Sequence, residues 1–388
     1  MKKYALITTL LIFAVALVHP VHAEEKDQGS NLAEEAKSAI LMERDTGEIL
    51  VDKNIHEKLA PASMTKIMTM LLIMEELEKG GLELEELVRV SEKAASMGGS
   101  QIFLEAGEEM AVKDLLKGVA VASGNDASVA LAERIAGSEE AFVQKMNEKA
   151  EELGLENTKF QNTTGLPADE HYSTAHDMAM IAQELLAFES ITDYTSIYED
   201  YLRKGEDNEF WLVNTNKLVR FYPGVDGLKT GFTNDAKYCL TATAKKGDMR
   251  VIAVVMGAET PKERNAAVSE LLDFAFNHYE TTKLYDKGDT ITSLNLLKAE
   301  NDHVNVITSE SISTLHKKGQ EPEDIRTTIR LEEDINLPLK KGDQVGSLLI
   351  ENDDEVISES ELVVEDDVHH AGYLTLWKRT WEKLAKHN

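Results

Sequence analysis

Two strand hairpins, at either end of a long helical stretch, constrain the fold of this chain more than any other feature. Residues 38–54 read as two short strands around a turn at Asp45–Gly47, and residues 238–258 as a longer hairpin that turns at Lys246–Asp248. Strands drawn from both ends of one segment, with helices between them, predict an α+β fold. The helical patterns cover residues 64–78, 112–122, 126–136, 139–153, 174–187 and 261–278.

The pattern changes near Lys283, and 388 residues are more than one domain usually holds. From there on, short stretches of alternating apolar and polar residues are separated by Gly, Asn and Asp. This texture predicts a small all-β unit after the helical one. Its expected strands lie within residues 289–298, 302–310, 323–331 and 344–351.

The first 23 residues have the layout of a secretory signal peptide. Lys2 and Lys3 precede an uncharged run, and small residues end at Ala23 before acidic residues begin. The run is short for a membrane span, which leaves an uncleaved anchor as the alternative. In an exported chain the lone Cys239 has no partner for an intrachain disulfide, so we expect it to be a small buried residue.

Acidic residues dominate the rest of the chain. The formal net charge is -29, and it becomes -31 when Lys2 and Lys3 leave with the signal peptide. A surface of this sign repels phosphate groups. Nucleic acid is therefore excluded as a partner.

The last residues reverse this charge. On a helix within 367–388, four cations lie on one side and an apolar set on the other. This pattern is typical of a helix in a membrane interface, with tryptophans at the level of the headgroups. The alternative is an amphipathic helix that docks on its own protein. The cations are Lys378, Arg379, Lys383 and Lys386, and the apolar residues are Leu374, Trp377, Trp381 and Leu384.

A serine and a lysine stand one turn apart at the start of the apolar helix predicted over 64–78. Pro61 suits a first helical turn, so Ser63 belongs to that turn and Lys66 to the next, on the same face. Serine is a good nucleophile only when a base removes its proton, and lysine can be that base when burial or a second cation lowers its pKa. The apolar helix offers burial, and free N–H groups at its start can bind an oxyanion.

Two further motifs follow in order. Ser123 and Asn125 lie in a turn between two predicted helices, from which a hydroxyl and an amide can point into a cleft. The triplet Lys229–Gly231 lies at the edge of the second hairpin, where its glycine permits close approach of a ligand backbone. Each motif is weak alone, and a second Ser-x-Asn at Ser293–Asn295 is expected to lie in a strand of the β unit. The three motifs in this order and on these elements would rarely coincide by chance.

With these motifs the chain resembles the low-molecular-mass penicillin-binding proteins that act as D-alanyl-D-alanine carboxypeptidases. The resemblance spans nearly the whole chain and includes "FQNTTGLPADEHYSTAHDMA" between the second and third motifs. It implies a penicillin-binding/β-lactamase-like catalytic domain, with an antiparallel sheet between helices, followed by a small all-β domain. The expected ranges are 1–23 for the signal peptide, 24–279 for the catalytic domain, 280–366 for the β-rich domain and 367–388 for a membrane-associating helix.

The resemblance also implies a role for each motif residue. Ser63 would attack the carbonyl of the terminal D-Ala-D-Ala bond, Lys66 would activate it, and Ser123 would relay a proton to the leaving D-alanine. Some relatives have histidine where this chain has phenylalanine after the third motif, so any role of that side chain is absent here. The implied substrate-binding residues are Asn125 for the peptide, Lys229 and Thr230 for the terminal carboxylate, Gly231 for close approach, and Phe232, whose N–H would form the oxyanion hole with that of Ser63.

The resulting hypothesis is a serine-type carboxypeptidase that trims the last D-alanine from peptidoglycan stem peptides through an acyl-enzyme, and that β-lactams inhibit covalently. It would be exported, would attach to the outer face of the cytoplasmic membrane, and would need no cofactor. A class A β-lactamase is one alternative, although no Glu-x-x-Leu-Asn loop stands between Asn125 and Lys229. A penicillin-recognising sensor or wall scaffold without turnover is the other.

Other residues near the motifs have ordinary interpretations. Residues Gly98–Ser100 are expected to form a surface turn, with a loop that lines the cleft as the alternative. Arg264 is expected to be exposed at the start of a helix, with a charge near the substrate carboxylate as the alternative. His171 and Tyr172 are expected to be packing residues, with the next helix capped at Ser173 or Thr174. No group of histidines or carboxylates has metal-ligand spacing, so no metal is expected.

Overall fold

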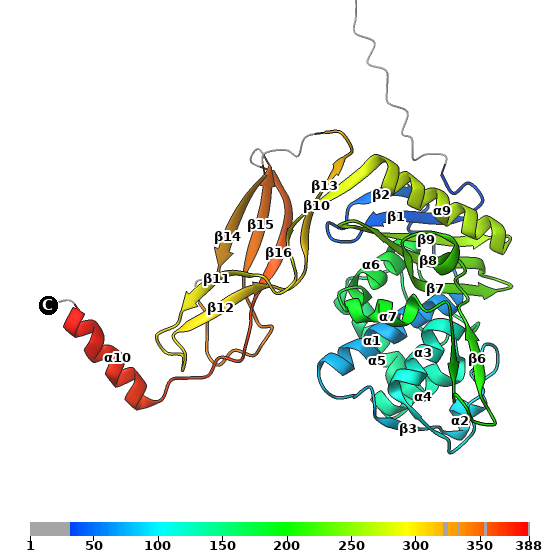
Figure 1. Ribbon diagram of the computed structural model, residues 1–388, viewed down its shortest axis with the longest axis horizontal. Helices are drawn as coiled ribbons and strands as arrows, with labels where there is room; N and C mark the ends of the chain where they lie inside the picture. Colours follow the sequence, from blue (N-terminus) through cyan, green and yellow to red (C-terminus); the bar gives the residue numbers. More distant parts are fainter. Residues whose placement is uncertain (1–31, 321–324, 333, 353–354, 387–388) are drawn as a thin grey trace, which may run out of the picture.

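The molecule consists of a larger domain of helices around a sheet and a smaller domain of strands, with the last helix extending from the smaller one (Figure 1). The computed structural model describes residues 32–320, 325–332, 334–352 and 355–386. The expected signal peptide, residues 1–23, lies outside the described residues.

A five-stranded antiparallel sheet forms the centre of the larger domain. Its strand order is β2-β1-β9-β8-β7, so the first hairpin of the chain pairs with the last one through β1 and β9. Leu41, for example, lies opposite Ala253. The two hairpins predicted from the sequence are thus parts of one sheet, as the α+β prediction requires. The strands are β1 (Ser38–Glu43), β2 (Ile49–Lys53), β7 (Val225–Thr233), β8 (Lys237–Lys246) and β9 (Met249–Ala258).

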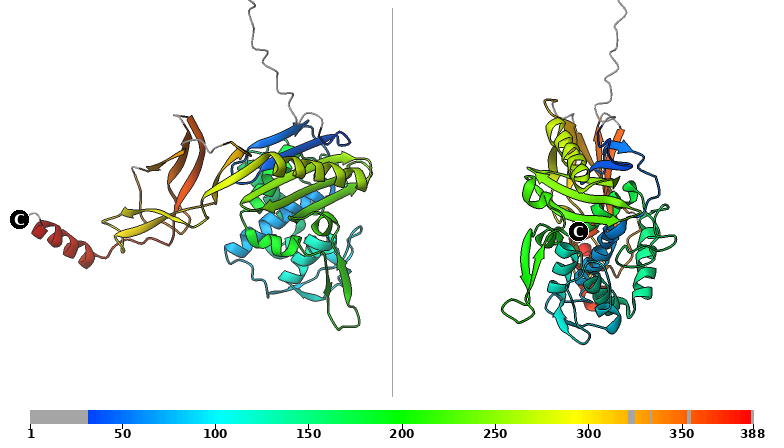
Figure 2. Two further views of the ribbon diagram at one scale, coloured as in Figure 1. Left: turned by 45° about the horizontal axis from the view of Figure 1, so that its top comes forward. Right: turned by 90° about the vertical axis from the view of Figure 1, so that its right-hand side faces the viewer.

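Helices cover both faces of this sheet. Successive strand residues point to opposite faces, so Ile40 packs with the helices that precede β7, whereas Leu41 packs with Leu271 of α9 (Pro261–His278). Figure 2 shows α9 lying across the sheet. All six predicted helices are present, with ends that differ by at most two residues. The others are α1 (Lys66–Glu78), α3 (Val112–Ala122), α4 (Asn125–Ala136), α5 (Glu139–Glu152) and α6 (Ala175–Leu185).

Helix α1 runs through the middle of the helical layer, and its first nine residues, 66–74, are all buried. A helix that is apolar on every side has to be buried on every side, and this is why Lys66 is removed from water. Several short elements around this layer were not predicted from the sequence. They are α2 (Glu92–Ala95), α7 (Thr192–Thr195), α8 (Leu218–Phe221), the 3₁₀ turns η1 (Ala62–Thr65) and η2 (Glu189–Ile191), and the hairpins β3 (Leu87–Arg89) with β4 (Glu109–Ala111) and β5 (Glu199–Leu202) with β6 (Phe210–Val213).

The smaller domain is a second five-stranded sheet, of order β11-β12-β16-β15-β14, beside a two-stranded ribbon of β10 and β13. The ribbon starts directly after α9, and Ser313 Oγ donates a hydrogen bond of 2.8 Å to Asp45 Oδ2 of the larger domain. The four predicted strand stretches are confirmed, and β10, β13 and β16 are additional. The bounds are β10 (Tyr279–Tyr285), β11 (Thr290–Asn295), β12 (His303–Thr308), β13 (Ile312–Lys317), β14 (Ile325–Leu331), β15 (Gln344–Asn352) and β16 (Glu355–Val364).

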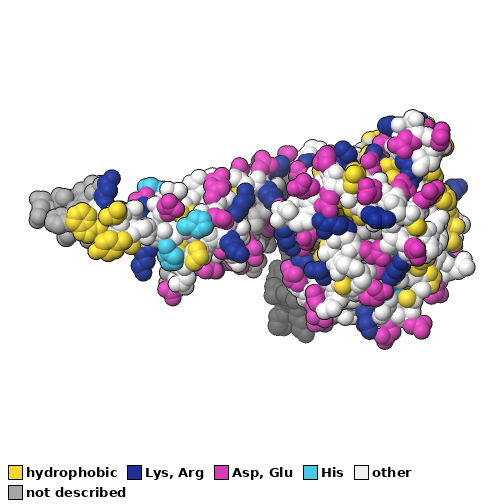
Figure 3. Space-filling model, turned by 90° about the horizontal axis from the view of Figure 1, so that it is seen from below, with side chains coloured by type: hydrophobic (Ala, Val, Ile, Leu, Met, Phe, Trp, Pro, Cys, Tyr) yellow, Lys and Arg dark blue, Asp and Glu magenta, His cyan; other side chains and the backbone are white. Residues whose placement is uncertain are grey.

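The tail forms α10 (Tyr373–Lys386). Tyr373 and Leu374 are 81% and 79% exposed, and hydrophobic side chains gather at this end of the molecule (Figure 3). Arg379, expected on a free cationic face, instead donates hydrogen bonds of 2.6–3.1 Å to the carbonyl oxygens of residues 297, 299 and 300. It therefore attaches the helix to the smaller domain. The side chains of Trp381, Lys383, Leu384 and Lys386 lie outside the described part.

A search of the described residues finds no helix with the length and apolar character needed to span a membrane.

The packing of the helical layer predicts the cost of a cavity. Phe142 on α5 is fully buried, and Phe142→Ala is expected to lower the free energy of unfolding by about 3–5 kcal/mol. Leu87→Ala, at a position that is 61% exposed, should change it by less than about 0.5 kcal/mol. Urea denaturation of both variants measures the difference. Equal effects would contradict the core assigned to this layer.

Candidate active site

The 3₁₀ turn before α1 presents Ser63 at the surface of the domain and Lys66 beneath it. Pro61 starts the turn with a φ of -77°, as expected for a first-turn proline, and Ser63 remains partly exposed. Lys66 is the first residue of α1 and is fully buried. The predicted relation holds, because the Lys66 Nζ atom lies 3.2 Å from Ser63 Oγ.

Three oxygen atoms surround the amine of Lys66. Besides the Ser63 hydroxyl, these are Asn125 Oδ1 at 2.7 Å and the backbone oxygen of Thr164 at 2.7 Å. The last two can only accept hydrogen bonds. A neutral amine has two hydrogens and one lone pair, so these two acceptors engage both hydrogens and leave the lone pair facing Ser63. The geometry suits removal of the hydroxyl proton by Lys66.

Electrostatics favour the neutral amine. The pKa of Lys66 is well below its ordinary range, first because burial removes the ammonium from water and second because Lys229 brings a positive charge nearby. Asp126 opposes this effect. Its carboxylate accepts hydrogen bonds from the backbone N–H groups of Ile102 and Leu104. Burial and a second cation, Lys229, therefore both act on Lys66.

The turn between α3 and α4 delivers the second motif. Ser123 has a left-handed backbone, with a φ of 63° and ψ of 33°, and its buried Oγ has no hydrogen-bond partner among the described residues. Asn125 starts α4, and its Nδ2 donates to Gly98 O at 2.6 Å. Its backbone N–H donates to Ser100 O at 2.7 Å. Interpreting 98–100 as a plain surface turn was incomplete, because this exposed loop holds Asn125 in place.

Edge strand β7 delivers the third motif. A Cβ atom on Gly231 would lie 2.7 Å from Pro61 O and 3.1 Å from Ala62 Cβ, so only glycine lets the strand pack against the nucleophile turn. The close approach is thus made by the chain's own backbone. Beyond it, the Phe232 side chain is 50% exposed and stacks on Tyr238 with ring centroids 4.4 Å apart.

Two cations are buried at this edge. Lys229 Nζ donates to Thr230 O at 3.0 Å, and Thr230 Oγ1 donates to Thr215 Oγ1 at 2.8 Å. Burial, with a further contribution from the Arg264 guanidinium, lowers the pKa of Lys229 to about 7. The prediction that Arg264 is exposed was wrong, since only 6% of it is accessible. From the sequence, Arg264 could be placed near the start of a helix, but not against the sheet on which α9 packs.

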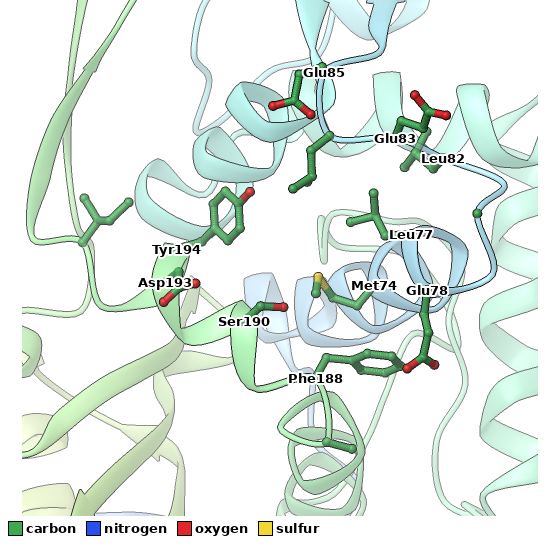
Figure 4. Close-up of a pocket in the computed structure, with 14 residues that line it drawn as sticks. Met74, Leu77, Glu78, Leu82, Glu83, Glu85, Phe188, Ser190, Asp193 and Tyr194 are labelled. Carbon is green, nitrogen blue, oxygen red and sulfur yellow. The ribbon is translucent and has the colours of Figure 1, made fainter. Parts of the chain in front are cut away.

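A separate cavity of about 820 Å³ lies at the far end of α1 and takes no part in this arrangement (Figure 4). Met74, Leu77 and Phe188 form apolar walls, and carboxylates such as Glu78 and Asp193 stand around them. It contains neither a lysine nor a histidine. Ser63 and Lys66 lie at the opposite end of the helix.

The Ser63–Lys66 geometry places a serine hydroxyl beside a buried lysine amine, which is the arrangement that a serine nucleophile with a lysine base requires. Residues 23–260 match the family model described as D-alanyl-D-alanine carboxypeptidase, and residues 279–370 match that of the penicillin-binding protein 5 C-terminal domain. The chain therefore belongs to the D-alanyl-D-alanine carboxypeptidase family of penicillin-binding proteins.

Individual relatives agree along the length of the chain. D-alanyl-D-alanine carboxypeptidase DacF of Bacillus subtilis is 57% identical over 385 residues, 98% of this chain and 99% of the relative. The structure of penicillin binding protein 5 from Haemophilus influenzae superposes with a TM-score of 0.66 at 32% identity, covering 86% of this chain and 98% of that one. Penicillin-Binding Protein D2 from Listeria monocytogenes, in its ampicillin-bound form, gives 0.56 at 29% identity, covering 62% and 98%. The chain is thus a serine-type D-Ala-D-Ala carboxypeptidase, and its predicted fold is confirmed.

The buried charge of Lys229 predicts how stability changes with pH. Its pKa falls from 10.5 to about 7 on folding, so between these values the unfolded chain binds more protons and stability rises with pH. Below pH 7 the full cost of burying the ammonium is present. We expect the wild type to gain stability relative to Lys229→Met between pH 7 and 9.5 in urea denaturation.

Lys245→Met, which removes an exposed lysine at the end of β8, is the control for the loss of one positive charge. Parallel pH profiles of the wild type and Lys229→Met would contradict the buried-cation account.

Proposed function

We propose that Ser63 carries out the carboxypeptidase reaction through a covalent acyl-enzyme formed on peptidoglycan pentapeptides. The observation that carries this proposal is the position of Lys66 Nζ, 3.2 Å from Ser63 Oγ with its two other neighbours acting as acceptors. An aligned lone pair and a lowered pKa are the two conditions that a lysine base must satisfy.

The reaction has two halves. Ser63 Oγ attacks the carbonyl carbon of the D-Ala-D-Ala bond while its proton passes to Lys66, and the carbonyl oxygen becomes an oxyanion. The C–N bond then breaks, and D-alanine leaves with a proton relayed through Ser123, whose buried hydroxyl has no other partner among the described residues. Water hydrolyses the ester, which releases the shortened peptide and restores the Ser63 hydroxyl.

Positive charge and backbone amides hold the substrate in this scheme. Lys229 and Arg264 are both buried, and in the described part of the chain neither forms an ion pair with a carboxylate, which suits binding of the terminal carboxylate with Thr230. That carboxylate would in turn favour the charged form of Lys229. The N–H groups of Ser63 and Phe232 would bind the oxyanion. Asn125, Gly231 and the edge of β7 would bind the peptide.

β-Lactams fit the same scheme as covalent inhibitors, because their strained amide would acylate Ser63. The Listeria relative with ampicillin bound supports this extension. The β-lactamase alternative needs a group that speeds deacylation, commonly a glutamate. The hydrogen-bond partners of Lys66 are a hydroxyl, an amide and a carbonyl, and none is a carboxylate.

Replacing the nucleophile tests this proposal. Ser63→Ala is expected to abolish labelling by a fluorescent penicillin and to lower D-alanine release from diacetyl-Lys-D-Ala-D-Ala at least 10³-fold, because the acyl-enzyme cannot form. Unlabelled penicillin should block both signals in the wild type. Persistent labelling of the variant would exclude Ser63 as the nucleophile.

The same assays separate the alternatives. Rapid and repeated turnover of a chromogenic cephalosporin would favour a β-lactamase. Penicillin labelling without any D-alanine release would favour a binding or scaffold role.

We also propose export and attachment to the outer face of the membrane, with a catalytic domain over 24–279, a β-rich domain over 280–366 and a membrane-associating segment over 367–388. The exposed Tyr373, Leu374 and Trp377 of α10 support this assignment, because aromatic and apolar groups favour the headgroup region. Attachment through Arg379 leaves this face of the helix accessible.

Truncation tests the tail. A chain ending at Gly372 is expected to keep its activity in solution but to lose most of its binding to anionic liposomes, since the apolar face goes with it. Co-sedimentation with vesicles measures the loss. The double variant Leu374→Ser and Trp377→Ser, which retains the cations, should weaken binding as well. Unchanged binding of the truncated chain would rule out this anchor.

A further inference from the structure

The segment between the second and third motifs lies along the nucleophile helix and contacts it at successive positions. Its Thr164 oxygen accepts from Lys66, and its Thr163 oxygen accepts from Thr69 Oγ1 at 2.8 Å. Gly165, at a φ of +81°, passes so close to Ala62 that a Cβ atom would overlap the Ala62 carbonyl oxygen. The position of this loop therefore sets the position of one of the two acceptors that orient Lys66.

The tip of the loop is rigid within itself. Asn162 Oδ1 accepts hydrogen bonds from the backbone N–H groups of Thr164 and Gly165, at 3.2 and 2.7 Å. The Asn162 side chain thus closes the turn on its own backbone. A further contact is needed to fix the position of this turn relative to α1.

His171 connects the other end of the loop to α1. It is 7% exposed, and its Nδ1 accepts a hydrogen bond of 3.0 Å from the Gln161 backbone N–H. The ring proton therefore resides on Nε2, which lies 2.8 Å from Thr65 Oγ1 and donates to it. Burial lowers the pKa of His171 to about 4, so the neutral ring with this tautomer is the form present near neutral pH.

Thr65 stands directly before Lys66 and two residues after Ser63. It is fully buried, so it does not reach a substrate bound outside the turn. Its hydroxyl ties the backbone of the nucleophile turn to His171, and through Gln161 to the segment that carries Thr164. The hydrogen bonds of His171 thus link the segment that carries Lys66 to the segment that carries Thr164.

We propose that Thr65 and His171 are a positioning pair for catalysis, which holds the Thr164 carbonyl against Lys66 and so aims the amine's lone pair at Ser63. This inference rests on the proposed role of Lys66 as base. A neutral amine rotates freely about its Cε–Nζ bond unless its hydrogens are engaged. When the loop moves away, only Asn125 still holds the amine, and the productive orientation becomes one of several. Misplacement of a reacting group by about 1 Å can cost a factor of 10² in rate.

The test compares Thr65→Val with Thr65→Ser. Valine keeps the shape but not the hydroxyl, and is expected to lower the rate constant for acylation by penicillin about 10- to 100-fold, and kcat for D-alanine release similarly, with KM within about twofold. Serine retains the hydroxyl and should stay within about threefold of the wild type. Thr308→Val is the stability control, because it removes a buried hydrogen bond of 2.8 Å to Asp286 O in the smaller domain.

If Thr65 and His171 act as a pair, the losses in acylation rate of their single variants should not add in the double variant. His171→Leu should slow acylation like Thr65→Val, and the double variant should be no slower than the slower single variant, because the two side chains act through one bond. Additive losses would overturn the inference, as would wild-type acylation by either folded single variant. If one variant fails to fold, the other still decides. A wild-type protein without penicillin adduct or D-alanine release would instead refute the proposed function.

Discussion

Everything in this site depends on a lysine amine that is buried beside a serine hydroxyl and hydrogen-bonded on two other sides. Burial is the largest cause that lowers the pKa of Lys66, but burial does not aim the lone pair of the amine. Orientation needs the two acceptors, Asn125 Oδ1 and Thr164 O, which come from segments about 60 and 100 residues away. The apolar helix supplies the burial that was expected from the sequence, and the two acceptors supply the orientation.

Close packing brings these segments together. The nucleophile turn lies between two glycines, Gly165 of the loop and Gly231 of β7, and at both positions a Cβ atom would collide with the turn's backbone. The small size of the two glycines thus lets the loop and β7 approach the turn closely enough for hydrogen bonds such as that from Lys66 to Thr164 O. Lys229, two residues before the second glycine, is brought near Lys66 by the same contact.

Sequence patterns predicted the helices and strands well, but they did not predict which backbone carbonyl groups take part in the site. Helices α3 and α9 could be predicted to the residue for different reasons. The apolar periodicity of α3 is strong, whereas α9 starts with Pro261 directly after the capping residue Thr260. The three motifs could be placed because their side chains are chemically distinctive. Thr164 and Gly98 contribute carbonyl oxygens, which every residue has, so no pattern marks them. The burial of Arg264 depends on how α9 packs on the sheet, which is a property of the whole fold.

The pairing of β1 with β9 also has a consequence for how the enzyme comes into being. Residues 38–43 pair with β2, which is close in sequence, and also with β9, more than 200 positions later, which is a contact of large sequence separation. A nascent chain that has exposed Ser63 and Lys66 still lacks the strand that brings Lys229 beside them. The proposed base is consequently complete only after residues 225–258 have been synthesised and have joined the sheet.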